Sequence, residues 1–139
     1  MKKTLALSLV FTALIFCLAG CSLSGTPSMD ELYWKYGINP ATAEANTPYE
    51  MSTEKPLSTD DLKSIYAEVK DLEWSTDMTF EEVYAKFGVD PNSATFNADG
   101  TMRVFTWMAD DTRDPRLGIL MRKNDDGWTY FGWNQIWLE

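Results

Sequence analysis

The sequence predicts an α+β fold in which two helices pack on a three-stranded antiparallel sheet, in the order ααβββ, over residues 58–139. Two observations predict this order. Apolar residues recur at the spacing of a helix face between residues 58 and 87, and from Thr95 onward they alternate with a period of two, as in a strand with one buried face. A partial repeat, consisting of one helix and a linker over residues 28–57, precedes this domain.

The partial repeat is predicted from an internal match. Residues 28–43 align without gaps to residues 79–94. In each copy, a capping-box pair begins an apolar stripe at helical spacing, and a glycine followed by an Asn-Pro or Asp-Pro turn ends it. We interpret the first copy as a repeat that lacks its strands, and a turn design shared by chance is the alternative. The matched features are Ser28 with Glu31, Thr79 with Glu82, and the glycines Gly37 and Gly88.

The segment between the two copies contains a linker and a helix. Residues 44–57 are polar, contain Pro48 and Pro56, and predict a linker. A helix is expected to begin near Ser58, because acidic residues in its first turn complement the helix dipole. Its apolar stripe consists of Leu62, Ile65, Tyr66 and Val69.

Three strands are expected in the last third of the chain. Turn sequences at residues 97–100 and 124–127 bracket alternating segments, and the second is typical of a hairpin. The expected strands cover about residues 101–109, 116–123 and 128–138, with a turn over residues 110–115.

The N-terminus predicts an export signal. Lys2 and Lys3 precede an apolar run of about 14 residues, shorter than the about 20 needed to span a bilayer. The run ends in Leu-Ala-Gly-Cys21 and resembles a bacterial lipoprotein signal with its lipobox. That resemblance implies cleavage after residue 20, a diacylglycerol thioether on Cys21 and a tether over residues 21–27. The alternative is an ordinary secretory signal in which Cys21 is incidental.

The lipoprotein resemblance implies a location in the cell envelope. The anchor would lie in the outer membrane of a Gram-negative cell, where a serine after the lipidated cysteine is typical, or in the outer face of a Gram-positive plasma membrane. Membrane contact through the N-terminal lipid follows, because each buried CH₂ contributes about 0.8 kcal/mol.

A second resemblance concerns the domain. The segment from Asp77 to Val83, continued to Phe87 and Gly88 and followed by predicted strands, resembles the superfamily of β-lactamase-inhibitor-like proteins and small SmpA/OmlA-type outer-membrane lipoproteins. Members share a Gly-Met-Thr helix ending in Leu-Gly and an antiparallel sheet of three or four strands, in some cases as tandem copies. This chain departs from the pattern with Asp77 for the glycine and Phe87 for the leucine. The resemblance implies a non-enzymatic binding module.

The amino-acid composition limits which catalytic or metal-binding sites the chain could form. The chain has no histidine, and Cys21 would be its sole cysteine after cleavage, so the usual bases, thiol nucleophiles and disulfides are absent. We therefore expect no catalytic residues, no metal site and no cofactor. The acidic clusters at residues 110–114 and 124–126 are interpreted as turn chemistry rather than Ca²⁺ ligands, because neither has EF-hand spacing.

The net charge limits the classes of molecule that the chain could bind. The net charge is −9, and removal of Lys2 and Lys3 leaves 10 basic and 21 acidic side chains, or −11. Such a chain repels phosphate backbones, so no nucleic acid is expected as a partner, and it favours a basic protein.

The strands suggest a binding surface. We expect one aliphatic face beneath the helices, formed by Met102, Val104, Met108, Leu117, Ile119, Met121 and Ile136. The other face would combine Trp, Phe and Arg, the composition of a protein-binding hot spot. Two alternatives stay open: residues 28–43 fold over that face, or the two faces are reversed. The predicted partner-binding residues are Arg103, Phe105, Trp107, Arg122, Phe131, Trp133 and Trp137.

The sequence thus predicts a lipid-anchored cell-envelope protein that binds another protein through an aromatic sheet face and is not an enzyme. Binding of a cell-wall glycan or a small ligand by the same face is the alternative.

Overall fold

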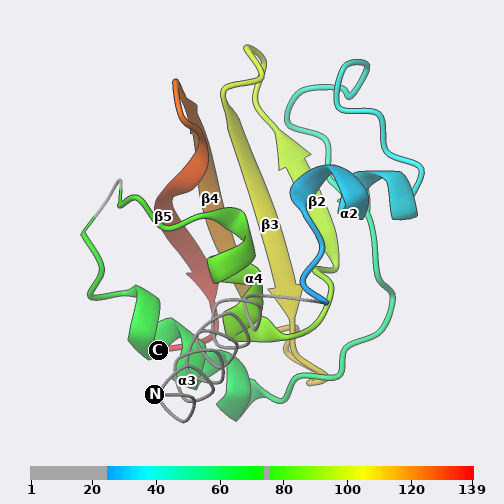
Figure 1. Cartoon of the computed structure of the whole chain (residues 1–139). Coiled ribbons are helices and arrows are strands. Elements are labelled where there is room, and N and C mark those ends of the chain that lie inside the picture. The colour runs from blue at the N-terminus through cyan, green and yellow to red at the C-terminus, as the bar shows by residue number, and fades with distance from the viewer. Residues whose placement is uncertain (1–24, 74–75) are drawn as a thin grey trace, which may run out of the picture.

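The computed structural model describes residues 25–73 and 76–139, and its central element is a five-stranded antiparallel sheet (Figure 1). The strands are neighbours in chain order, which makes the sheet a simple meander. They are β1 (Tyr49–Glu50), β2 (Ser93–Phe96), β3 (Met102–Met108), β4 (Arg116–Asn124) and β5 (Gly127–Ile136). The predicted ααβββ arrangement is therefore wrong: the sheet has five strands instead of three, and with three short helices among the described residues the fold is mostly β.

The two unexpected strands are short and depend on tertiary contacts. β1 has two residues and β2 has four, too few to show an alternating pattern. The buried Asn92 holds this edge together, because its Nδ2 donates to the carbonyl oxygens of Ser52 and Glu54, both at 2.8 Å. Its Oδ1 accepts from the Met108 amide at 2.8 Å. One amide side chain thus attaches the expected linker to the sheet.

The three described helices are α2 (Met29–Lys35), α3 (Thr59–Val69) and α4 (Phe80–Phe87). Each begins with a capping box, in which the N-cap hydroxyl and the acidic side chain three residues later satisfy each other's backbone N–H groups. The predicted helix starts at Ser28, Ser58 and Thr79 are confirmed. Beyond the repeated helices, Gly37 and Gly88 have φ of 66° and 67°, a left-handed conformation that favours glycine.

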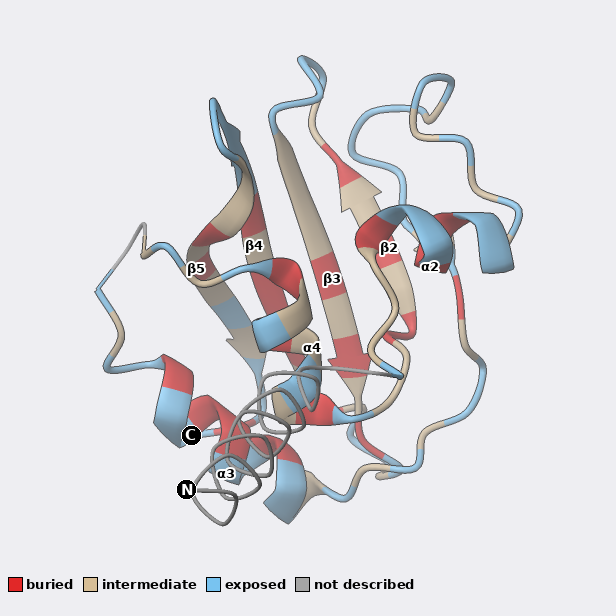
Figure 2. Cartoon of the chain, in the orientation of Figure 1, coloured by how far each residue is buried: buried red, intermediate tan, exposed pale blue. Residues whose placement is uncertain are grey.

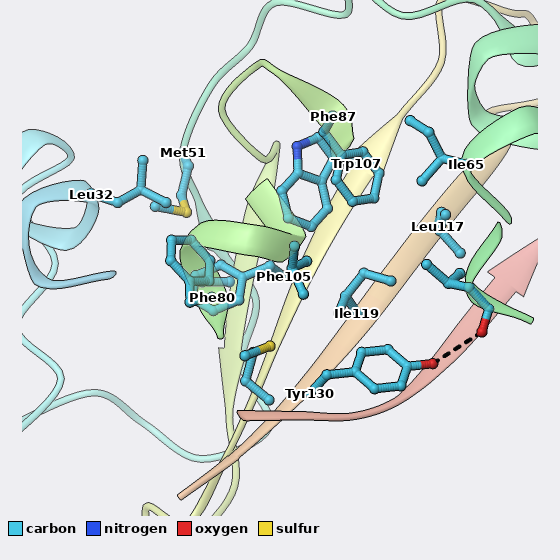
Figure 3. Close-up of a cluster of buried hydrophobic side chains, with 14 of the residues drawn as sticks. Leu32, Met51, Ile65, Phe80, Phe87, Phe105, Trp107, Leu117, Ile119 and Tyr130 are labelled. Atoms are coloured by element: carbon cyan, nitrogen blue, oxygen red, sulfur yellow. Dashed lines mark hydrogen bonds between the residues drawn. The ribbon is translucent and has the colours of Figure 1, made fainter. Parts of the chain in front are cut away.

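All three helices pack on the same face of the sheet (Figure 1). Buried residues lie on the helices and on the strands of the sheet, where Figure 2 colours them red. Aromatic rings dominate this core (Figure 3): Phe87 of α4 stacks on Trp107 with centroids 3.7 Å apart, and Phe80 contacts Phe105 at 4.8 Å. Tyr33 of α2 lies 5.8 Å from Phe105, so the partial repeat belongs to the same core.

Candidate functional site: the open face of the sheet

The face of the sheet opposite the helices carries no helix in the described part of the chain (Figure 1). We call it the open face. Strand alternation and register assign its members, and only the two glycines among them are buried. The open face consists of Ser93 and Thr95 of β2, Met102, Val104, Thr106 and Met108 of β3, Arg116, Gly118, Leu120 and Arg122 of β4, and Thr129, Phe131, Gly132, Asn134 and Ile136 of β5.

An apolar row crosses the open face. Val104 pairs with Thr95 on one side and with Leu120 on the other. A register shift between Leu120 and Met121 makes a β-bulge that gives β5 an extra residue, Phe131. The Phe131 ring lies 5.1 Å from the Arg122 guanidinium, a cation–π distance. The side chains of Val104 and Leu120 are half-buried on this face, and none of the three members of the row belongs to the buried core.

The neighbouring row is polar and flat. Thr106 pairs with Gly118, and Gly118 pairs with Asn134. The Asn134 side chain lies across the glycine, because a Cβ placed on Gly118 would come within 2.2 Å of Asn134 Oδ1. A glycine at this point lets an amide lie flat on the sheet, so the centre of the open face offers a hydrogen-bonding group beside the apolar row.

Positive charges flank these two rows. Arg116 pairs with Met108 and Ile136 at one end of the strands, and Arg122 pairs with Met102 and Thr129 at the other. Strands β3 to β5 place no acidic side chain on this face. A chain of net charge −9 thus has a local basic and apolar surface on its sheet.

The predicted partner-binding residues are divided between the two sides of the sheet. Phe105 and Trp107 are buried, 0% and 1% exposed, beneath α2 and α4, so the expectation that they form an exposed face is corrected. Trp133 is half-buried against Tyr66 of α3, with centroids 4.9 Å apart. The reversed-face alternative describes Trp107 and Trp133, which pack under α4 and α3, while Phe105 is also contacted by Tyr33 of segment 28–43.

The remaining four predicted residues have other positions. Arg122 and Phe131 lie together on the open face. Arg103 is on the helix side, stacked on aromatic rings. Trp137 lies just beyond β5, is 63% exposed and has φ of 62°. The predicted lipidation site, Cys21, lies outside the described residues.

The predicted assignment of residues to the two faces of the sheet is wrong, and the error arises at the connection between β3 and β4. Residues 109–115 form a seven-residue loop, and Met108 pairs with Arg116, so residues of equal parity face each other. The expected faces combined even positions of β3 with odd positions of β4. Met102, Val104, Met108 and Ile136 are therefore on the open face, whereas Leu117, Ile119 and Met121 are in the core. The odd number of residues in this loop is the sequence feature that relates to which positions of β3 and β4 lie on the same face.

No family model, curated protein or solved structure matches this chain. Within residues 25–73 and 76–139, no three His, Cys, Asp or Glu side chains lie close enough together to hold a metal ion. No helix in the same part of the chain is long and apolar enough to cross a membrane.

Proposed function

We propose that this protein is a lipid-anchored protein of the bacterial cell envelope that binds another protein on the open face and does not catalyse a reaction. The observation that carries the proposal is the apolar pair Val104 and Leu120, which lies on a sheet face that carries no helix among the described residues, in a small domain whose opposite face is covered by three helices. Exposed contiguous apolar surfaces with a polar rim are typical of protein interaction sites.

The anchor is supported by the sequence pattern that ends in Cys21. The folded domain begins a few residues later, because Ser28 caps α2 and Met29 is buried. A lipid on Cys21 would leave only residues 22–27 between the membrane surface and the domain. The open face would then meet its partner close to the bilayer.

The open face also restricts the partner's chemistry. Net charge alone favours a basic partner, but the two charges on strands β3 to β5 that lie on this face are the guanidinium groups of Arg116 and Arg122. The surface that fits best is an apolar patch bordered by carboxylates, because complementary charges at the rim set register and association rate. Arg122, on the Phe131 ring, is held in place to make such a contact.

Glycan binding receives less support from this geometry. A sugar-stacking platform needs exposed rings, and Phe105 and Trp107 are buried. Phe131 is the one aromatic ring that strands β3 to β5 contribute to the open face.

Site-specific photo-crosslinking in cells tests the proposal. A photoreactive residue is placed in the full chain at Val104 or at Leu120, and a control residue at Lys63, which is exposed on α3. We expect one protein to be captured from both open-face positions and not from Lys63. Equal capture from Lys63, or none from Val104 and Leu120, would contradict the proposal.

Charge reversal makes the test specific to the face. Arg116→Glu combined with Arg122→Glu should reduce crosslinking from Leu120 about tenfold or more, because it replaces attraction to the partner's carboxylates by repulsion. Lys63→Glu combined with Lys123→Glu is the matched control, since it changes the net charge equally and both lysines are exposed away from the open face. An equal loss with this control would show that total charge, not the open face, governs the contact.

A further inference from the structure

Arg103 has an unusual environment on the helix side of the sheet. Its guanidinium carbon lies 4.0 Å from the centre of the Trp128 ring, 5.0 Å from that of Tyr33 and 5.6 Å from that of Phe96. The side chain is half-buried, and three rings from α2, β2 and β5 surround it. Cation–π attraction of this kind holds a guanidinium in place but does not neutralise its charge.

The hydrogen bonds of Arg103 are incomplete. Nη1 donates to the Met29 sulfur at 2.8 Å, a weak acceptor. Nε is buried and has no hydrogen-bond partner within the described residues, and no Asp or Glu carboxylate of that part of the chain lies within 4.0 Å of the guanidinium. A half-buried charge normally acquires a partner, and this chain has 21 acidic side chains from which one could have come.

Arg103 lines a cavity of about 530 Å³ between the β2–β3 turn and the loop after α2. Arg103 is the one basic residue on the cavity wall. Pro40, Ala41 and Ala98 contribute small apolar groups to a wall that also contains Asn39, Asn97 and Asp99. We propose that this cavity binds a carboxylate, held by Arg103 and carried on a small apolar group. Because Nε is buried and Nη1 donates to Met29, Nη2 is the nitrogen left to donate a charge-assisted hydrogen bond to a carboxylate.

Asp99, on the same cavity wall, favours a singly charged ligand. Its Oδ1 accepts hydrogen bonds from the hydroxyl and the amide of Thr101 at 2.6 and 2.9 Å and from Asn97 Nδ2 at 2.7 Å. The hydrogen bonds from Thr101 have the largest effect, and together with the bond from Asn97 they keep the pKa of the Asp99 carboxyl below its usual range. Asp99 therefore stays ionised at neutral pH. A negative charge beside the site disfavours a phosphate dianion more than a carboxylate, because the repulsion grows with the charge of the ligand.

Binding to the isotope-labelled full chain, followed by NMR of the backbone amides at residues 97–103, tests the site. The probes are N-acetyl-Ala-Ala with a free carboxylate, the same dipeptide with a C-terminal amide, propionate, and inorganic phosphate. We expect saturable shifts with the free acid, none with the amide, and weaker binding of phosphate. If propionate saturates the site as the dipeptide does, the ligand is a small free acid, whereas response to the dipeptide alone indicates a peptide C-terminus.

Substitutions at Arg103 and Asp99 test whether these two residues determine the affinity, with Arg122→Gln as the control. Arg103→Lys keeps the positive charge but removes the planar guanidinium group. It should weaken binding about tenfold or more, the effect of losing a charge-assisted hydrogen bond. Arg122→Gln, on the open face, is the control and should change nothing. Asp99→Asn keeps an acceptor for the turn and should tighten binding, which provides a second test if Arg103→Lys does not fold.

The contrary outcomes are distinct. Equal shifts with the free acid and the amide, no saturable shift with any probe, or unchanged affinity in Arg103→Lys would overturn the proposal. In that case, Arg103 serves only to attach α2 to the sheet by stacking.

Discussion

The Tyr36 hydroxyl, just beyond α2, donates a hydrogen bond of 2.5 Å to Oδ2 of Asp90 in the turn that follows α4. Lys35 Nζ donates to the same oxygen at 2.5 Å, and the Tyr84 hydroxyl donates to Oδ1 at 2.7 Å. The Asp90 side chain is 14% exposed. One carboxylate therefore joins the ends of the two repeated helices, beside a cavity of about 510 Å³.

Asp90→Ala should lower the free energy of unfolding by about 2–3 kcal/mol, because it leaves two tyrosine hydroxyls without their charged acceptor. Urea unfolding followed by circular dichroism measures the loss. Asp125→Ala is the control, since Asp125 is exposed in the β4–β5 turn and should change the stability by less than about 0.5 kcal/mol. Equal effects of the two substitutions would show that the hydrogen bonds to Asp90 contribute little to the free energy of unfolding.

The same carboxylate predicts a pH dependence. Burial is the largest single influence and raises the pKa of Asp90, but hydrogen bonds from Lys35, Tyr36 and Tyr84 together bring that pKa below its usual range. A lowered pKa in the folded state stabilises the protein above the pKa of an unfolded aspartate, about 3.9, and this stabilisation is lost as the pH falls through the folded value.

Unfolding free energies of the wild type and Asp90→Asn, measured between pH 2 and pH 7, test this prediction. The difference between the two proteins should be constant above about pH 5 and should shrink below about pH 4. A difference that grows on acidification would show that the pKa of Asp90 is raised in the folded protein.

Trp107→Ala should destabilise the protein by about 3–5 kcal/mol, the usual cost of removing a large buried ring. Its ring stacks on Phe87 at an interplanar angle of 7°, and its Nε1–H donates to the Val89 carbonyl oxygen at 2.9 Å. Trp34→Ala is the matched control, because Trp34 is 87% exposed on α2. Thermal unfolding of both variants gives the comparison, and an unaltered melting temperature for Trp107→Ala would contradict the buried position.

Gly118→Ala should destabilise the wild type and have little effect in an Asn134→Ala background. The added methyl group meets the Asn134 amide in the first case, and that amide is absent in the second. The double-mutant cycle should give a coupling energy of about 0.5 kcal/mol, because Asn134 is exposed and its amide can turn aside in part. Additive effects in chemical unfolding would mean that Asn134 does not lie over Gly118.

Cys21→Ser should release the protein from membranes, because the hydroxyl cannot form the thioether that the lipoprotein signal implies. Fractionation of cells should place the wild type with the membranes and the variant in the soluble fraction. Ser22→Ala, which leaves the cysteine in place, controls for changes near the cleavage site. Membrane association of both variants would contradict lipidation at Cys21.

Features that depend on a few consecutive residues could be predicted from the sequence. The capping boxes at Ser28 and Thr79, the helix start at Ser58 and the left-handed Gly37 and Gly88 are local, because each is satisfied within one turn of backbone. The same holds for the β4–β5 hairpin turn at residues 124–127. In the carboxylate site proposed above, the sequence predicts a binding role for Arg103 but not for the residues around it.

Features that depend on pairing between distant residues could not be predicted. Strand β1 exists because Tyr49 meets Ala94, and Asn92 fastens the linker to β2 across about 40 residues of chain. The sequence by itself determined where helices start and stop and which segments alternate. Only the tertiary structure decided which alternate residues face the helices, because the seven-residue β3–β4 loop sets the register, and a one-residue slip exchanges the two faces of a strand. That register buried Phe105 and Trp107 and left Val104 and Leu120 on the open face.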